Sequence, residues 1–326
     1  MARRGLVLGG GGLVGAAWMV GVLASLSDEL DPTEMDVLVG TSAGSVLAAA
    51  LTAGVTPNEM VAHQRNDPDL DGPLAGLAYD FGVLGTRSDL PRPGIGSPAL
   101  ARRLLSKPGA HRLPVALAAV LPRGRASMGG LPELVDQLLP SWPVDRVLAI
   151  CAMDYTNGQR RVFDGAEGEA SPCTAVRASC AMPGWFSPVP VDGRDYVDGG
   201  SYSFTSVDVA AGHGLDELYV LAPLAHDVRT AGRLTIADRL LRWWRVPQTR
   251  LMYREAEKAR QEGTRIRLIT PTAEELVAIG TNAMDESRRL AVLETALRGR
   301  GVGSVTSLGP QQRTVRPAGP APGNAG

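Results

Sequence analysis

Short apolar runs alternate with longer amphipathic segments along most of the chain. The apolar runs are typical of buried strands, at 5–8, 36–39, 146–153, 161–163, 194–197, 217–221 and 265–269. Helical spacing appears between and after them, at about 15–30, 43–53, 131–139, 172–181, 235–261, 273–280 and 285–297, and Pro247 is expected to break or kink the fifth of these helices. Strands that alternate with helices form a mainly parallel sheet covered on both faces, so the pattern predicts an α/β fold.

The pattern loosens between 66 and 127, where Gly, Pro and Asp are frequent and short helices are expected only at 97–105 and 114–121. A loop-rich but apolar insertion of this kind fits a cover over an active site, and it fits a variable surface subdomain equally well. Residues 311–326 are rich in Pro, Gly and polar groups and predict a disordered tail. We therefore expect one domain over 1–310 with an insertion at 66–127.

Composition narrows the class of protein. The chain has 326 residues, of which 44% are hydrophobic and 21% charged, a balance typical of a globular protein with an ample core. The net charge of −1 gives no indication of nucleic-acid binding. Cys151, Cys173 and Cys180 lack metal-ligand spacing and are odd in number, which favours reduced core residues.

The N-terminus requires a choice between two interpretations. Arg3 and Arg4 precede an uncharged run at 5–27, as in a secretory signal or a membrane span. Four consecutive glycines at 9–12 would weaken a helix there by roughly 1 kcal/mol each. A strand, a glycine loop and a helix explain the run better. We accordingly expect a cytoplasmic protein without a signal peptide or transmembrane helix.

One short stretch, 37–45, has the pattern of a nucleophile elbow. A β-branched apolar run enters it, an alanine-rich run leaves it, and Gly40, Ser42 and Gly44 complete the pattern G-x-S-x-G. In such an elbow the serine lies on a strained turn that exposes its hydroxyl, and the flanking glycines avoid a steric clash. Ser42 is therefore the candidate nucleophile.

A glycine loop at 9–15 follows the first strand and opens a helix. Gly10, Gly12 and Gly15 spell G-x-G-x-x-G, the pattern of a dinucleotide site. That fold places an acidic residue at the end of the next strand, whereas here the next strand leads into the elbow. We therefore interpret the loop as a donor of backbone N–H groups to an oxyanion. A non-catalytic nucleotide- or lipid-binding protein remains the alternative.

A serine nucleophile needs a base. The best-placed candidate is Asp198, which ends a strand and precedes Gly199 and Gly200. His213 and His226 follow it in the order of a Ser-Asp-His triad, although each lies in a segment typical of a surface loop. A dyad and a triad both remain open on these grounds.

The ordered set of motifs resembles the patatin-like phospholipase family. The resemblance rests on the glycine block at 6–12, the elbow at 40–45, a third block at 177–183 followed by 186–189, and the Asp-Gly-Gly motif at 198–200. It covers roughly 5–222, and the run 284–289 is also similar to bacterial members.

The resemblance implies a three-layer α/β/α fold with a mainly parallel central sheet, and a Ser–Asp dyad without histidine. Ser42 would be the nucleophile and Asp198 its base. Backbone N–H groups of Gly10, Gly11, Gly12 and Ala43 would form the oxyanion hole, with support from Gly40, Gly44, Gly199 and Gly200. The expected reaction is hydrolysis of lipid carboxyl esters, of phospholipid or lysophospholipid, without metal or organic cofactor; acyl transfer would use the same acyl-enzyme.

The chain departs from the family pattern at two places. Val14 stands where the glycine block usually continues with arginine, and 201–206 replaces a polar Asn-x-Pro-like segment. Both changes leave the dyad intact and leave substrate preference open.

Two tryptophans on the long helix suggest a second type of contact. Trp243 and Trp244 are flanked by Arg242 and Arg245, a pattern that suits a peripheral membrane interface. The same pattern is typical of a helix that packs its tryptophans on the sheet and turns arginine to solvent. The oligomeric state stays open.

Overall fold

A computed structural model describes residues 2–77, 91, 93–106, 112–225, 236–299 and 304–309, with the side chains of 236–244, 304 and 305 excepted. Several sequence-based expectations therefore lie outside the described residues: the tail at 311–326, His111, His226, the side chains of Trp243 and Trp244, and part of the insertion at 66–127.

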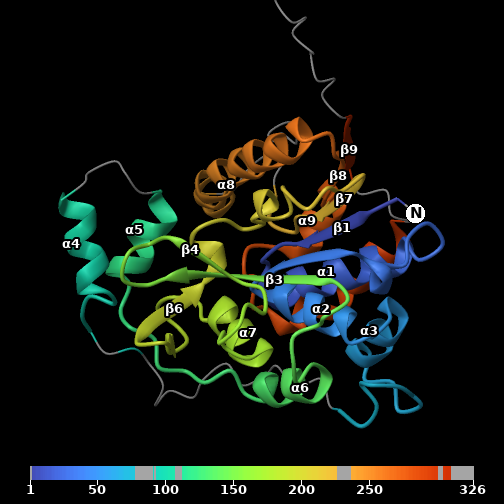
Figure 1. Ribbon diagram of the computed structural model, residues 1–326, viewed down its shortest axis with the longest axis horizontal. Coiled ribbons are helices and arrows are strands. Elements are labelled where there is room, and N and C mark those ends of the chain that lie inside the picture. Colours follow the sequence, from blue (N-terminus) through green and yellow to red (C-terminus); the bar gives the residue numbers. More distant parts are fainter. Residues whose placement is uncertain are drawn as a thin grey trace, which may run out of the picture.

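Within the described residues, nine strands form one sheet (Figure 1). Eight of them run in the order β5-β6-β3-β2-β1-β7-β8-β9, and β4 pairs with β3 beside this path. The strands are β1 (Arg4–Leu8), β2 (Val37–Thr41), β3 (Val147–Asp154), β4 (Arg160–Phe163), β5 (Val189–Val191), β6 (Arg194–Asp198), β7 (Glu217–Leu221), β8 (Arg265–Thr270) and β9 (Ser304–Leu308).

The five central strands, β3, β2, β1, β7 and β8, are parallel, which confirms the predicted α/β sheet. The outer strands β4, β5, β6 and β9 pair antiparallel. Parallel strands end at the same edge, so the carboxyl ends of β1 and β2 lie side by side, with Leu8 opposite Gly40. The glycine loop and the elbow follow these two strand ends and are therefore neighbours.

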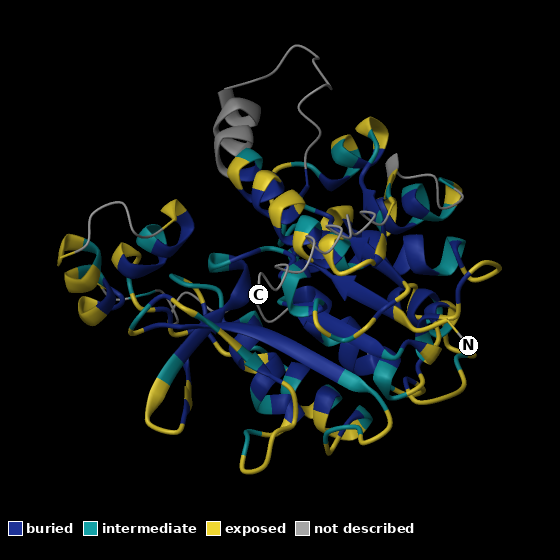
Figure 2. Cartoon of the chain, turned by 45° about the horizontal axis from the view of Figure 1, so that its top comes forward, coloured by how far each residue is buried: buried dark blue, intermediate teal, exposed yellow. Residues whose placement is uncertain are grey.

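Helices cover both faces of the sheet. They are α1 (Gly12–Ser25), α2 (Ala43–Thr52), α3 (Pro57–Gln64), α4 (Pro98–Ser106), α5 (Leu113–Val120), α6 (Leu131–Leu138), α7 (Pro172–Cys180), α8 (Ile236–Gln261), α9 (Ala273–Ile279) and α10 (Arg289–Arg298). Leu6 and Leu8 of β1 pack into the core under α1, α2, α7 and α10, whereas Val7 faces the core under α8. This alternation produces the expected three layers, with a buried sheet between them (Figure 2).

The N-terminal run belongs to the core of the domain. β1 is buried from Gly5 to Leu8, and α1 packs against α10 with Trp18 and Met19 fully buried. The helix starts at Gly12, three residues before the predicted start. No helix among the described residues combines the length and the apolarity needed to span a membrane.

Helix α8 differs from the sequence-based expectation, whereas α4 and α5 agree with it closely. The sequence predicts a break or a kink at Pro247; α8 continues through Pro247 as one 26-residue helix, so it is not broken there. In the insertion, α4 and α5 form at nearly the predicted positions and pack together. Val115 and Ala119 of α5 make a small separate core with Met153 of β3 and Val197 of β6.

Candidate active site

The elbow forms as predicted. Strand β2 ends at Thr41, α2 begins at Ala43, and Ser42 between them has φ +52° and ψ −126°. That backbone region is unfavourable for a residue with a side chain, so the surrounding fold must hold it. A Cβ on Gly44 would lie 2.0 Å from the Leu8 carbonyl oxygen, and one on Gly40 would lie 2.5 Å from the Ser45 Cα. The two flanking glycines are therefore required by close packing.

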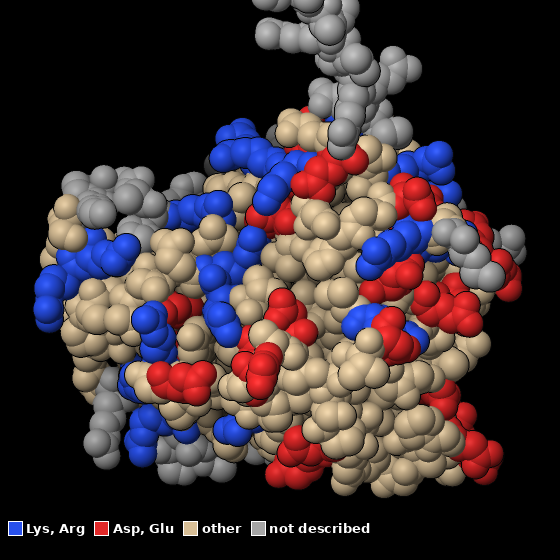
Figure 3. Space-filling model, viewed as in Figure 1, with Lys and Arg blue, Asp and Glu red and all other residues tan. Residues whose placement is uncertain are grey.

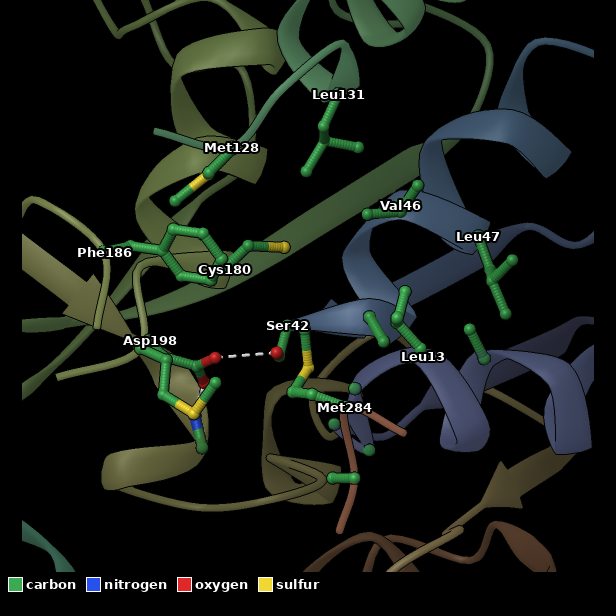
Figure 4. A pocket seen from close by; sticks show the side chains of 18 of the residues that line it. Leu13, Ser42, Val46, Leu47, Met128, Leu131, Cys180, Phe186, Asp198 and Met284 are labelled. Carbon is green, nitrogen blue, oxygen red and sulfur yellow. Dashed lines mark hydrogen bonds between the residues drawn. The ribbon is translucent and has the colours of Figure 1, made fainter. Parts of the chain in front are cut away.

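Ser42 and Asp198 meet directly (Figure 4). The Ser42 hydroxyl donates to Asp198 Oδ2 at 2.7 Å, across 156 residues of sequence. Asp198 ends β6, and its Oδ1 accepts from the Gly200 N–H at 2.7 Å within the short helix η3 (Gly199–Ser201). Burial raises the pKa of Asp198 to about 6, although both hydrogen bonds act in the opposite direction. A carboxylate with this pKa accepts a proton more readily than an exposed aspartate.

Ser179 fixes the elbow through two hydrogen bonds. Its Oγ accepts from the Ser42 N–H at 2.8 Å and donates to the Cys151 carbonyl at 2.6 Å. Ser179 is fully buried on α7, while Cys151 lies on β3, the neighbour of β2. One hydroxyl thus ties the strained residue to the adjacent strand. Sequence reasoning did not assign it a role, although it falls within the third motif at 177–183.

The glycine loop supplies fewer free donors than expected. The Gly10 N–H donates to the Phe204 carbonyl at 2.7 Å, so this predicted oxyanion donor already has an acceptor within the protein. The N–H groups of Gly11, Gly12 and Ala43 have no acceptor among the described residues, and all three residues line the same cavity as Ser42. These three remain the predicted oxyanion donors.

The segment at 203–207 that bonds Gly10 is itself fixed by a buried acid. Glu255 of α8 accepts from the Ser203 hydroxyl at 2.9 Å and from the Val207 N–H at 3.2 Å. Burial raises the pKa of Glu255 to about 7, and Arg160 lies 3.9 Å away. Glu255 is a support for the loop, because its carboxylate contacts the backbone behind the cavity and is not among the residues that line it.

Ala283 and Met284, from the C-terminal part of the chain, contact the glycine loop. The Ala283 carbonyl accepts from the Val14 N–H at 3.2 Å, and Met284 lines the cavity beside Gly12. Val14 is fully buried in the core, in the place of the usual arginine. The Ala283 carbonyl thus accepts from one of the first N–H groups of α1, which are the groups that bind phosphate in a dinucleotide site. The interpretation of the loop as a dinucleotide site therefore loses support.

A cavity of about 440 Å³ opens beside Ser42 and is lined mainly by apolar side chains. α2 contributes one wall with Val46 and Leu47. The opposite wall comes from α5, α6 and the loops around them: Leu117, Leu121, Met128, Leu131, Leu134 and Phe186. Leu117 and Leu121 belong to the 66–127 insertion, so the insertion contributes to the wall of the cavity.

The histidines do not complete a triad among the described residues. His213 lies four residues before β7 begins, at the edge of the sheet opposite Ser42. His63 of α3 lines the cavity, and burial lowers its pKa. Cys180 also lines the cavity, but burial raises the pKa of its thiol to about 12 and keeps it protonated. The described residues contain no group of His, Cys, Asp and Glu arranged to hold a metal ion.

An elbow serine bonded to a buried aspartate thus lies at the carboxyl ends of parallel strands, beside an apolar cavity. A family model for patatin-like phospholipase matches residues 6–211. The chain therefore belongs to the patatin-like phospholipase family and is a phospholipase or esterase of that family.

Solved structures include distant neighbours. VipD from Legionella pneumophila is 16% identical, with a TM-score of 0.41 and coverage of 91% of this chain and 67% of VipD. The type III effector protein ExoU is 17% identical, with a TM-score of 0.33 and coverage of 94% of this chain and 55% of ExoU. The comparison with curated protein sequences found no match.

Proposed function

We propose that the protein hydrolyses carboxyl esters of lipids, with Ser42 as nucleophile and Asp198 as its base. The observation that carries the proposal is the 2.7 Å hydrogen bond from the Ser42 hydroxyl to Asp198 Oδ2, two residues that line the apolar cavity. No described histidine bonds either residue, so Asp198 takes the proton without an intermediary.

The reaction proceeds through an acyl-enzyme. Ser42 Oγ attacks the ester carbonyl carbon while its proton moves to Asp198 Oδ2. The N–H groups of Gly11, Gly12 and Ala43 stabilise the oxyanion. The tetrahedral intermediate collapses, and the leaving alcohol takes the proton back from Asp198. Water then attacks the acyl-serine with Asp198 again as base, which releases the fatty acid and restores the Ser42 hydroxyl.

The cavity supports an acyl chain as the group that enters the site. Its α2 wall runs from Ser42 to Ala50, about 12 Å at 1.5 Å per residue. An extended chain advances ~1.27 Å per bond, so about ten carbons fit along this wall. The lining offers few groups that could bind a charged head group, so the head group of a phospholipid or lysophospholipid would stay at the mouth.

Labelling with a fluorophosphonate probe tests the nucleophile. We expect covalent modification at Ser42, located by peptide mapping, and no labelling or ester hydrolysis in Ser42→Ala. Cys180→Ser is the matched control, because Cys180 lines the same cavity yet should leave labelling intact. Label on another residue, or full activity of Ser42→Ala, would refute the proposal. Analysis of products in water and with added alcohol separates hydrolysis from acyl transfer.

A further inference from the structure

Helix α5 lies at the surface although its sequence carries no polar side chain. It reads Leu-Pro-Val-Ala-Leu-Ala-Ala-Val from Leu113 to Val120. A helix that is apolar all round is normally buried or in contact with lipid. Here one face packs on β3 and β6, while Leu113 is 39% exposed and Val120 is 53% exposed.

The exposed face of α5 continues to the mouth of the cavity. Leu113, Leu117, Val120 and Leu121 follow one another at helical spacing, and Leu117 and Leu121 line the cavity. Trp185 lies next to the segment that follows α5, because its carbonyl accepts from the N–H groups at 125 and 126. Its side chain is 41% exposed and extends the apolar surface. The apolar surface is thus continuous with the entrance to the active site.

The same part of the chain is strongly basic. Residues 90–132 contain seven Lys and Arg and no Asp or Glu, although the whole chain has a net charge of −1. Arg102, Arg103 and Arg125 are exposed and form no ion pair with any described residue. Figure 3 shows Lys and Arg gathered over α4 and α5 at the left edge of the molecule. α4 packs beside α5, so the arginines flank the apolar face.

We propose that this surface docks on an anionic phospholipid bilayer. We name it the α5 face: Leu113, Val120, Leu121 and Trp185, with Arg102, Arg103 and Arg125 around them. The apolar side chains would enter the boundary of the acyl region, and the guanidinium groups would meet lipid phosphates. Charge complementarity and continuity with the cavity mouth favour a membrane over a protein partner. The inference rests on the proposed function, since docking here presents lipid to Ser42.

Co-sedimentation with vesicles tests the docking apart from catalysis. Ser42→Ala protein serves as parent, so that vesicles stay intact, with vesicles of phosphatidylcholine alone or mixed with phosphatidylglycerol. We expect binding to the mixed vesicles that weakens with salt. Arg102→Gln with Arg103→Gln should weaken it about 30-fold, and Val120→Asp about tenfold.

Two matched controls lie on other exposed surfaces. Arg254→Gln on α8 and Val277→Asp on α9 replace exposed residues of the same types and should leave vesicle binding unchanged. Equal binding to both vesicle types, no binding, or a loss confined to Arg254→Gln would overturn the proposal. A change from dimer to monomer in Val120→Asp, with vesicle binding retained, would assign the face to a second copy of the chain and also overturn it.

A second readout separates this inference from the proposed function. In proteins that retain Ser42, the Arg102 and Arg103 variants should hydrolyse a dispersed nitrophenyl ester at the rate of the unaltered protein, while hydrolysis of vesicle phospholipid falls with binding. If the unaltered protein fails to hydrolyse any ester while binding to anionic vesicles through the α5 face is observed, the proposed function fails and the docking stands. If it hydrolyses esters but the variants bind as the parent does, only the docking fails.

Discussion

The two sides of the cavity are built from different interactions. On the frame side, formed by the glycine loop, the elbow and the Asp198 turn, polar atoms bond to one another: Ser42 to Asp198, Ser42 to Ser179, and Gly10 to Phe204. On the cover side, formed by α5, α6 and Met128, apolar side chains such as Leu117 and Leu134 line the space. We infer that changes on the frame side alter the chemical step, whereas changes on the cover side alter the binding of the acyl chain.

Two buried carboxylates differ in role: Asp198 belongs to the frame side, and Glu255 lies behind it. Burial raises the pKa of both, to about 6 for Asp198 and about 7 for Glu255. Asp198 faces the cavity and accepts from Ser42, whereas Glu255 accepts from Ser203 and Val207 behind it. Burial alone therefore does not identify the base. The hydrogen bond to the nucleophile and access to the cavity do.

The largest effect is expected from Asp198→Asn, which keeps the shape of the side chain and removes the proton acceptor. Ester hydrolysis should fall about 100- to 10,000-fold, because general-base catalysis is lost. Steady-state kinetics with a dispersed ester measures the loss, and Asp195→Asn on the same strand is the control, since Asp195 pairs with Arg123 at the surface. Activity within twofold of the parent would exclude Asp198 as base.

The same variant changes stability in a defined direction. Burial raises the pKa of Asp198 in the folded state above its unfolded value, so ionisation destabilises the fold as pH rises from about 4 to about 6. Asp198→Asn removes this effect. At pH about 8 the variant should be more stable than the parent by on the order of 1 kcal/mol, and the difference should vanish below pH about 4. Thermal melting across pH measures it.

Ser179→Ala should have the next largest effect. It removes the acceptor of the Ser42 N–H and the donor to Cys151 in a fully buried place, which relaxes the strained elbow. We expect kcat to fall about 10- to 100-fold, with a stability loss of about 1–3 kcal/mol. Ser171→Ala is the matched control: it removes the N-cap of the same helix at a similar loss of stability, about 0.5–2 kcal/mol, without contact to Ser42. Equal kcat values in the two variants would reduce Ser179 to a structural role.

Much of the frame was predictable because its constraints are local. The elbow glycines reflect contacts within a few residues or with the adjacent strand, and short apolar runs predicted the five central strands. The Ser42–Asp198 pair is predicted by the order of motifs in the sequence alone. Asp198 ends a strand at the sheet edge where the elbow lies, which explains why a pair so distant in sequence is in contact.

Interactions that depend on tertiary packing could not be predicted. The hydrogen bond from the Gly10 N–H to the Phe204 carbonyl cannot be predicted from neighbouring residues in the sequence. The same is true of the two hydrogen bonds of the Ser179 hydroxyl. Met284 lies 272 residues after Gly12, and only the fold brings the two together. β5 is only three residues long and carries Pro190 at its centre, and β9 contains only two apolar residues, Val305 and Leu308, so neither gives a clear strand pattern. The continuity of α8 through Pro247 likewise shows packing prevailing over a local signal.

The pH dependence of catalysis distinguishes the two carboxylates. Asp198 must be ionised to accept the Ser42 proton, so kcat/KM should fall about tenfold per pH unit below pH about 6. Glu255→Gln should not change the pH at which kcat/KM is half-maximal, which is the midpoint of this limb, because Glu255 does not contact the nucleophile. A midpoint that moves in Glu255→Gln would show that the buried acid behind the cavity controls the reaction. Rates on a dispersed ester between pH about 4 and 8 measure the profile.

The smallest effect is expected on the cover side, from Leu134→Ala on α6. The change removes apolar contact from the cavity wall without touching the Ser42 network, at about 0.8 kcal/mol for each methylene no longer covered. KM for a nitrophenyl decanoate should rise about three- to tenfold, while kcat/KM for the acetate should stay within twofold, because a two-carbon chain does not reach this wall. Leu105→Ala, on an 83% exposed residue of α4, is the control. Equal losses on both esters would mean that the cover also positions the reacting groups, and the division between frame and cover would then fail.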